Sequence, residues 1–296
     1  MGRRCLIIGA SGQLGRALCA ELRVRHEVIE AAHRVTRPDQ YCLDLADPAA
    51  TARALAQIAP EWILIAGALG NVDRAELERE RCLAVNVEGP RAVAEYAQAH
   101  GCTVAYYSTD AVFDGTRASY QERDPVAPLN FYARSKVQAE TVMQTLLPNR
   151  SLVIRTAWLY GPDERRRNFI LRLVDELRAG QVVEVPSDQW GSPTYTEDVA
   201  HITRVLLEQG SSGLFHAVGP EVVNRAALAQ QVCRQFGLDA QLLQPRSSAQ
   251  LHQVARRPLR VELDCRQLHS MVPHAFRTLT EGLEALSSWD PALVAG

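Results

Sequence analysis

Short apolar runs alternate with longer stretches of helical periodicity through the first half of the chain. This alternation is typical of parallel strands connected by helices that cover both faces of a sheet. We therefore expect an α/β protein with a doubly wound parallel sheet of six strands. Five of the six strands are expected at residues 5–9, 26–32, 62–68, 103–108 and 151–156, and helices are expected at 14–23, 47–60, 82–101 and 131–147.

A glycine-rich turn with the pattern GxxGxxG stands between the first expected strand and the first expected helix. Its glycines are Gly9, Gly12 and Gly15. In this context glycine lets the backbone turn sharply and lets a pyrophosphate approach the amide groups at the positive end of the helix. The alternative is a plain corner that needs a positive φ. Because a catalytic pattern occurs farther along the chain, we favour a dinucleotide site.

The end of the second expected strand indicates which dinucleotide binds. In such folds the side chains there meet the adenosine ribose, which carries either a free hydroxyl or a phosphate. Glu30 is suited to a free hydroxyl, whereas Arg34 stands where a guanidinium could grip a phosphate. We expect NADPH and keep NADH as the alternative. For Arg34 and Arg37 the alternative is a solvated loop.

After residue 160 the alternation becomes irregular. Helical periodicity near 169–180, 196–210 and 225–237 is separated by stretches that contain Pro and Arg. We interpret this part as a smaller lobe whose sequence is interleaved with the first. The predicted division is a dinucleotide-binding domain over residues 1–158, with a return around 190–210, and a mainly substrate-binding lobe over 159–296.

Composition argues against several classes of function. The 296 residues carry a formal net charge of −2, so no broad positive field attracts a nucleic acid. The seven cysteines form no CxxC pair and the eight histidines no HxxxH pair, so we expect buried free thiols in a reducing cytosol and no metal site. No apolar stretch approaches bilayer length, so we expect a cytoplasmic protein without a membrane partner, and we leave a homodimer open.

Tyr132 and Lys136 form a YxxxK pair within an expected helix. A spacing of four residues places both side chains on one helix face, one turn apart. Ser108, Thr109 and Asp110 end an expected strand at the carboxyl edge of the sheet, where ligands collect. Together these positions point to proton transfer beside a nicotinamide.

The expected chemistry is the reduction of a carbonyl. Tyr132 protonates the developing alkoxide while Thr109 hydrogen-bonds the same oxygen. A free tyrosine has a pKa of about 10, and the nearby ammonium of Lys136 is expected to lower it toward the working range. Lys136 is also expected to hold the nicotinamide ribose. The alternative is an ordinary amphipathic helix surface, since YxxxK is frequent by chance.

An ordered series of motifs over nearly the whole chain resembles the dTDP-4-dehydrorhamnose reductase family of the extended short-chain dehydrogenase/reductase superfamily. The motifs are GASGQLG, STDAVFDG, PLNFYARSK, RTAWLYG, DQWGSPTYTEDVA and RPLRVELD. Such a series is far more specific than any single motif. The resemblance implies an NAD(P)H-dependent reductase of a nucleotide-linked 4-keto-6-deoxy sugar, with dTDP-4-dehydrorhamnose as the expected substrate.

The resemblance also implies roles for individual residues. The implied catalytic residues are Thr109, Tyr132 and Lys136. On the substrate side it implies Thr109 again, with Asp110, Trp158, Asn168 and Thr194. Core packing is the alternative for Trp158, and helix capping is the alternative for Asn168. The predicted cofactor-binding residues, besides Tyr132 and Lys136, are Gly9, Ser11, Gly12, Gln13, Leu14, Gly15, Arg34, Asp44, Leu45, Ala66, Gly67 and Ala68.

The chain departs from the family's usual pattern beside the expected sugar pocket. Ile65, Leu69 and Gly70 stand where the family has an Asn and then an aromatic residue followed by Thr, and Ala111 stands where it commonly has a tyrosine. Another nucleotide sugar is therefore an alternative substrate. Related 4,6-dehydratases carry Glu at the position of Ala111, so dehydration is disfavoured. Epimerisation and a non-catalytic regulatory role, as in the similar methionine adenosyltransferase beta subunit, are further alternatives.

Overall fold

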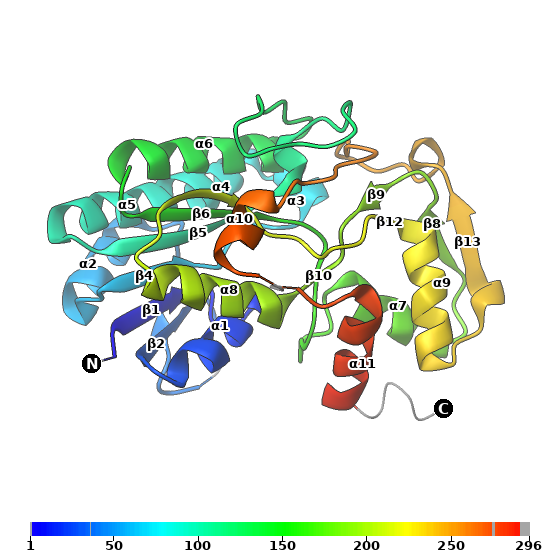
Figure 1. Ribbon diagram of the computed structural model, residues 1–296, viewed down its shortest axis with the longest axis horizontal. Coiled ribbons are helices and arrows are strands. Elements are labelled where there is room, and N and C mark those ends of the chain that lie inside the picture. The colour runs from blue at the N-terminus through cyan, green and yellow to red at the C-terminus, as the bar shows by residue number, and fades with distance from the viewer. Residues whose placement is uncertain (1, 36, 274–275, 291–296) are drawn as a thin grey trace.

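The computed structural model describes residues 2–35, 37–273 and 276–290. Its centre is a parallel sheet of seven strands in the order β11-β6-β5-β4-β1-β2-β3 (Figure 1). The strand order reverses between β1 and β4, as in doubly wound dinucleotide-binding folds, and the predicted fold class is confirmed. The strands are β1 (Arg4–Ile8), β2 (Glu27–Ala32), β3 (Tyr41–Cys42), β4 (Trp62–Ile65), β5 (Thr103–Thr109), β6 (Ser151–Thr156) and β11 (Gly213–His216).

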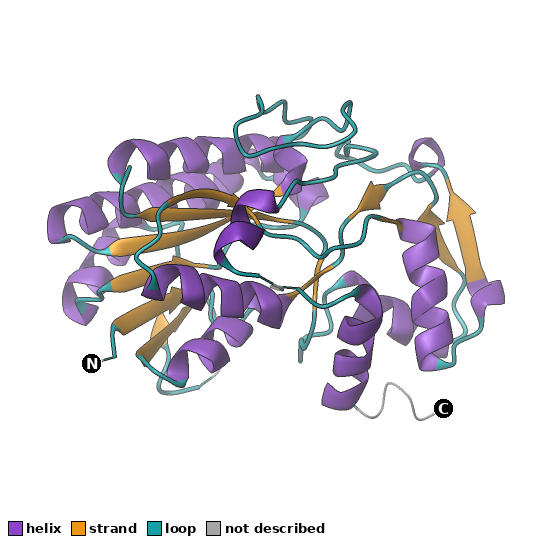
Figure 2. Cartoon of the chain, viewed as in Figure 1, coloured by secondary structure: helices purple, strands orange, loops and turns teal. Residues whose placement is uncertain are grey.

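Helices cover both faces of the sheet (Figure 2). Within the described residues, no helix is both long and apolar enough to cross a membrane. The helices on one face are α1 (Gln13–Arg23), α8 (Thr196–Glu208) and α10 (Arg266–Met271). Those on the other face are α2 (Pro48–Ile58), α5 (Gly89–His100) and α6 (Phe131–Leu146).

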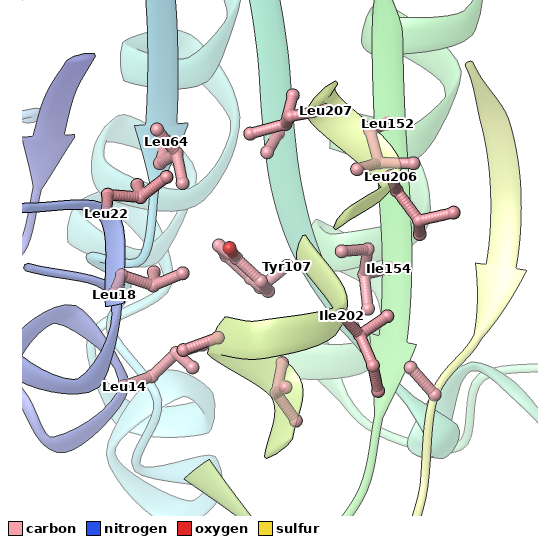
Figure 3. Close-up of a cluster of buried hydrophobic side chains, with 14 of the residues drawn as sticks. Leu14, Leu18, Leu22, Leu64, Tyr107, Leu152, Ile154, Ile202, Leu206 and Leu207 are labelled. Atoms are coloured by element: carbon pink, nitrogen blue, oxygen red, sulfur yellow. The ribbon is translucent and has the colours of Figure 1, made fainter. Parts of the chain in front are cut away.

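The core beneath α1 and α8 is built mainly from aliphatic side chains (Figure 3). Leu14, Leu18 and Leu22 repeat every four residues along α1, so they share the face that packs on the sheet. Tyr107 of β5 lies among them, and its hydroxyl donates to Thr203 of α8 at 3.0 Å. The apolar face of α1 therefore determines how the helix that follows the glycine-rich turn sits on the strands.

The sheet has one strand more than the six that the sequence predicts. β11 comes from the irregular half of the chain, and its four residues are too few to show a period. It pairs in parallel with β6 and extends the sheet on that side. The strand expected at 62–68 is also shorter than predicted. β4 ends at Ile65, and residues 66–68 leave the sheet at its carboxyl edge.

The long helix expected at 82–101 is interrupted. It consists of α4 (Arg79–Leu83), a π-helical turn called η1 (Ala84–Glu88), and then α5. Pro90 has no N–H to donate to the carbonyl of Asn86 four residues earlier, so the regular α pattern cannot continue there. Asn86 is buried in the π turn, where its Oδ1 accepts from the N–H of Leu69 (2.8 Å) and its Nδ2 donates to the hydroxyl oxygen of Ser135 (3.0 Å).

A second lobe, at the right of Figure 1, has a hydrophobic core of its own. Two of the predicted helices lie there, and the third, α8, packs on α1 instead. The division of the chain at residue 158 stays a prediction. The main elements of this lobe are α7 (Phe169–Arg178), β8 (Val183–Pro186), α9 (Arg225–Phe236), β13 (Leu243–Arg246) and α11 (Leu279–Trp289).

An ion pair buried inside the sheet domain joins α6 to β6. Arg155 donates through Nε to Oε1 of Glu140 at 2.9 Å and through a terminal nitrogen to Oε2 at 2.6 Å. Their side chains are only 4% and 5% exposed. Because an unpaired charge at this depth is strongly unfavourable, the pair fixes the helix that carries Tyr132 and Lys136 against the sheet.

We expect Glu140→Gln to lower the free energy of unfolding by about 3–5 kcal/mol, since it leaves the guanidinium of Arg155 buried without a counter-charge. Glu184→Gln is the matched control, because Glu184 pairs with Arg246 at 3.2 Å on the surface. The control should lose less than about 1 kcal/mol. Urea unfolding followed by circular dichroism measures both. Equal losses in the two variants would contradict a structural role for the buried pair.

Candidate active site

The glycine-rich turn lies where β1 and β2 end beside the loop that follows β4. Gly9 has a φ of +90°, and its N–H and that of Ala10 both donate to the carbonyl of Ala31, at 2.8 and 3.0 Å. A Cβ at Gly9 would lie 2.6 Å from the Cα of Gly67. A Cβ at Gly15 would lie 2.8 Å from the Cα of Ala10. Both positions therefore require glycine, because neighbouring backbone leaves no room for a side chain.

The first turn of α1 directs backbone donors to the same edge of the sheet. Its N-cap, Gly12, offers no capping side chain, and the first turn contains no acidic residue. Gln13 donates to the carbonyl of Leu159 at 3.2 Å, while its buried Oε1 has no partner among the described residues. Amides at the positive end of a helix bind phosphate groups well. The predicted stretch from Ser11 to Gly15 thus fits the pyrophosphate of a dinucleotide.

The side chains after β2 differ in part from the sequence-based interpretation. Glu30 is buried, and its carboxylate accepts from Gln40 (2.7 Å) and pairs with Arg37 (2.5 Å) and Arg23. It is therefore occupied and does not offer an oxygen to a ribose hydroxyl, and Arg37 is not simply solvated. Arg34 is exposed, and no described residue pairs with its guanidinium. This arrangement favours a phosphate at the ribose over a free hydroxyl.

Two of the predicted cofactor-binding residues, Asp44 and Leu45, lie shortly after β3, and the resemblance implies that they face the adenine. Asp44 pairs with Nδ1 of His33 at 3.1 Å and accepts from the N–H of Ala46 at 2.9 Å. Leu45 is buried in the core on the α2 side of the sheet. Asp44 is therefore the accessible member of the pair, whereas Leu45 mainly supports the loop.

The loop after β4 forms the opposite wall of the predicted cofactor site. The N–H groups of Ala66 and Gly67 both donate to the carbonyl of Ile8 at 2.9 Å. Ala66 and Gly67 are partly exposed and Ala68 is exposed. The contact of Asn86 with Leu69 holds the far end of this loop. Sequence reasoning did not identify Asn86, although a polar residue inside an apolar helical pattern was a visible signal.

Thr109, Tyr132 and Lys136 lie together at the carboxyl end of β5. Thr109 is the last residue of that strand, and Tyr132 lies in the first turn of α6. The side chain of Thr109 acts on the phenol of Tyr132 and lowers its pKa. Lys136 is buried one turn farther along α6, with Nζ 4.1 Å from the ring centroid of Tyr106. The structure thus places the three predicted catalytic side chains on two neighbouring elements at one edge of the sheet.

Burial determines the ionisation of these groups. It raises the pKa of Tyr132 well above the usual value, the carboxylate of Asp110 raises it further, and the hydrogen bond with Thr109 opposes the rise. Burial lowers the pKa of Lys136 to about 7, against the opposing effect of Glu140. The prediction that Lys136 lowers the pKa of Tyr132 is therefore wrong. Desolvation disfavours the charged form of both side chains and is the largest influence on both pKa values.

Asp110 lies beside this group. The hydroxyl of Thr109 donates to Oδ1 of Asp110 at 3.2 Å and accepts from the N–H of Ala111 at the same distance. Burial raises the pKa of Asp110 to about 6, whereas Thr109 and Arg225 lower it. The carboxyl group is thus mostly ionised at neutral pH. It faces Arg225, a residue that sequence reasoning did not select.

Trp158 and Arg225 form the far side of the site. The Cζ atom of Arg225 lies 3.4 Å from the ring centroid of Trp158 and 4.6 Å from that of Phe169. Trp158 is partly exposed and packs against two hydrophobic clusters, so its contact with a substrate stays a prediction beside the core-packing alternative. No spacing rule connects Arg225 with Trp158, because Arg225 follows β12 (Val223–Asn224), which pairs with β9 (Trp190–Gly191) beside the indole ring.

Two predicted substrate contacts make hydrogen bonds with the backbone. Asn168 caps α7, where its Oδ1 accepts from the N–H of Leu171 (3.0 Å) and its Nδ2 donates to the carbonyl of Gly161 (3.1 Å). Thr194 is fully buried, donates to the carbonyl of Ser192 (3.0 Å) and accepts from the N–H of Gly219 (3.1 Å). Their contact with a substrate stays a prediction.

Two further predictions concern metal ligands and thiols. Among the residues that the structure describes, no cluster of three His, Cys, Asp or Glu side chains could hold a metal ion. All seven cysteines are free. Cys42 is exposed, unlike the buried thiols predicted from the sequence, and the others are buried.

The doubly wound sheet, the glycine-rich turn and the Thr-Tyr-Lys group define the class of short-chain dehydrogenase/reductase folds. Comparison with known families is more specific. Residues 3–288 match the family described as the RmlD substrate binding domain. The chain belongs to this family, and its predicted membership among the dTDP-4-dehydrorhamnose reductases is confirmed.

Individual relatives are similar over most of their length. A dTDP-4-keto-6-deoxy-D-glucose reductase of Streptomyces niveus is 35% identical over 246 residues, which cover 83% of each chain. A dTDP-4-dehydrorhamnose reductase of Streptomyces griseus is 33% identical over 98% of this chain and 91% of its own. The crystal structure of dTDP-4-dehydrorhamnose reductase from Bacillus anthracis in complex with NADP has a TM-score of 0.89 at 28% identity and covers 98% of this chain and 100% of its own.

We expect Gly9→Ala to weaken NADPH binding by roughly tenfold or more, or about 1.4 kcal/mol. The added methyl group would push the turn away from Gly67, and alanine is strained at a φ of +90°. Gly70→Ala is the control, because a Cβ there meets nothing within 4 Å. Titration of NADPH by fluorescence measures both affinities. Unchanged binding in Gly9→Ala would exclude the glycine-rich turn as the pyrophosphate site.

Proposed function

We propose that this protein is an NADPH-dependent reductase of a dTDP-linked 4-keto-6-deoxy sugar, with dTDP-4-dehydrorhamnose as the first candidate substrate. The observation that carries the proposal is the placement of Thr109 at the end of β5 and of Tyr132 in the first turn of α6, at the carboxyl edge of the sheet and beside the glycine-rich turn. Family membership and the NADP bound by the Bacillus anthracis relative support the reaction class and the cofactor. NADH is the alternative cofactor.

The residues of the glycine-rich turn and Arg34 would hold the cofactor, whose bound nicotinamide supplies a hydride for the carbonyl carbon. Tyr132 gives its proton to the oxygen that becomes an alkoxide. Its high pKa keeps the phenol protonated at neutral pH, which suits a donor. Lys136 lies one turn along α6, where a positive charge would stabilise the phenolate that forms.

Thr109 positions the reacting oxygen in this proposal. Its single O–H donates to Asp110 in the structure, so the hydroxyl must rotate toward the substrate to donate there. The ionised carboxylate of Asp110 repels a nearby phenolate and so favours return of the proton to Tyr132. Thr109 acts in the opposite sense and stabilises the phenolate that forms.

The names of the relatives, rather than features of the pocket, limit which sugars are candidate substrates. The Streptomyces niveus relative is named for dTDP-4-keto-6-deoxy-D-glucose, and the Streptomyces griseus relative for dTDP-4-dehydrorhamnose. Leu69, Gly70 and Ala111 stand beside the site in this chain. Both keto sugars are therefore offered in the assay. A homodimer and a cytoplasmic location complete the proposal, and sedimentation and cell fractionation test them.

We expect Tyr132→Phe to lower the turnover number by about two to four orders of magnitude, because the positioned proton donor is lost. The assay follows the loss of NADPH absorbance with each dTDP-linked keto sugar. Tyr96→Phe is the control, since Tyr96 stacks on His100 at the end of α5 near the start of β5. A turnover number in Tyr132→Phe equal to that of the wild type would contradict this mechanism. NADPH binding without any turnover in the wild type would favour the regulatory alternative.

A further inference from the structure

Arg225 is a cation without an ordinary partner in the described part of the chain. It begins α9, and its N–H donates to the carbonyl of Gln189 at 2.9 Å. Its guanidinium is stacked on Trp158 and Phe169, but no described side chain accepts a hydrogen bond from it or pairs with it within 4.0 Å. Aromatic rings cover the apolar faces of a guanidinium and leave its in-plane N–H donors for an acceptor.

The ring beneath Arg225 is held in a strained conformation. Trp158 has a φ of +41°, a region that a bulky side chain rarely adopts. A Cβ at Gly191 would lie 2.6 Å from Cε2 of the indole, so the neighbouring strand must have glycine to admit the ring. Strain of this kind persists where the surroundings impose it, and it gathers at ligand sites. Trp158 and Arg225 are therefore a prearranged pair.

The charges around this pair are unbalanced. Arg172 and Arg257 oppose the charge of Arg225, and Asp110 is the acid that favours it. Arg257 is neutralised by Asp73, to which it donates two hydrogen bonds of 2.9 Å. Arg172 is exposed on α7, and no described residue pairs with its side chain. Burial lowers the pKa of Arg225 to about 9, so it still carries its charge at neutral pH.

We propose that Arg225, stacked on Trp158, binds the diphosphate of the nucleotide sugar and so places the keto sugar against Thr109 and Tyr132. A guanidinium can donate two parallel hydrogen bonds to phosphate oxygens, which fixes orientation as well as position. Asp110 lies on the reacting side and repels the anion, so the diphosphate stays with Arg225 while the uncharged sugar reaches Thr109. This inference rests on the proposed function, because it assumes a nucleotide sugar as the substrate.

Binding of dTDP, thymidine and NADPH to the full-length protein tests the proposal by calorimetry. We expect Arg225→Met to weaken dTDP binding by about ten- to hundredfold, because charged hydrogen bonds are lost. Thymidine, which has no phosphate, and NADPH should bind as to the wild type. Arg225→Lys keeps the charge but not the planar pair of donors. Its affinity for dTDP should therefore lie between that of the wild type and that of Arg225→Met. In turnover assays KM for the keto sugar should rise more than kcat falls.

Arg234→Met is the matched control, since Arg234 is exposed on the same helix. It should bind dTDP like the wild type. Wild-type affinity for dTDP in a folded Arg225→Met protein would overturn the proposal and leave the proposed function standing. If that variant does not fold, wild-type affinity in Arg225→Lys would overturn it equally. A wild-type protein that binds NADPH but neither dTDP nor UDP would remove both this inference and the proposed function.

Discussion

The close approach of several backbone segments at Gly9 determines how the rest of this protein is arranged. β1, β2, the loop after β4 and the start of α1 approach one another at that residue so closely that no side chain fits. The amides of Gly9 and Ala10 are used by Ala31, while those at the start of α1 are left facing the edge of the sheet. Residues at the start of α1 would therefore hold a cofactor at the same edge of the sheet where β5 ends in Thr109.

Burial favours the uncharged form of both Tyr132 and Lys136. It keeps Tyr132 protonated, as a donor requires, and it brings Lys136 close to neutrality, so that its charge responds to the surroundings. The sequence suggested the opposite, a lysine that makes the tyrosine more acidic. Motif spacing reports which side chains are neighbours, but it does not report how far each is desolvated, and here desolvation is the larger effect.

The features that were predictable are those encoded locally. Apolar periods located α1 and most strands, and the YxxxK spacing placed Tyr132 and Lys136 on one face of α6. The features that were missed depend on contacts between distant segments. Arg225 reaches Trp158 only through the second lobe, Glu30 is taken by Arg23 and Arg37, and Thr194 is buried by a loop that follows β11. β11 itself was too short to leave a period in the sequence.

The path of the chain limits how such a protein can diversify. After β6 the backbone enters the second lobe, returns to the sheet as α8 and β11, leaves again for α9, comes back as α10 and enters the second lobe once more as α11. The second lobe is therefore not a cassette that recombination could exchange at a single junction. New substrate preferences in this architecture must arise by point substitution and loop change within a scaffold that is inherited whole.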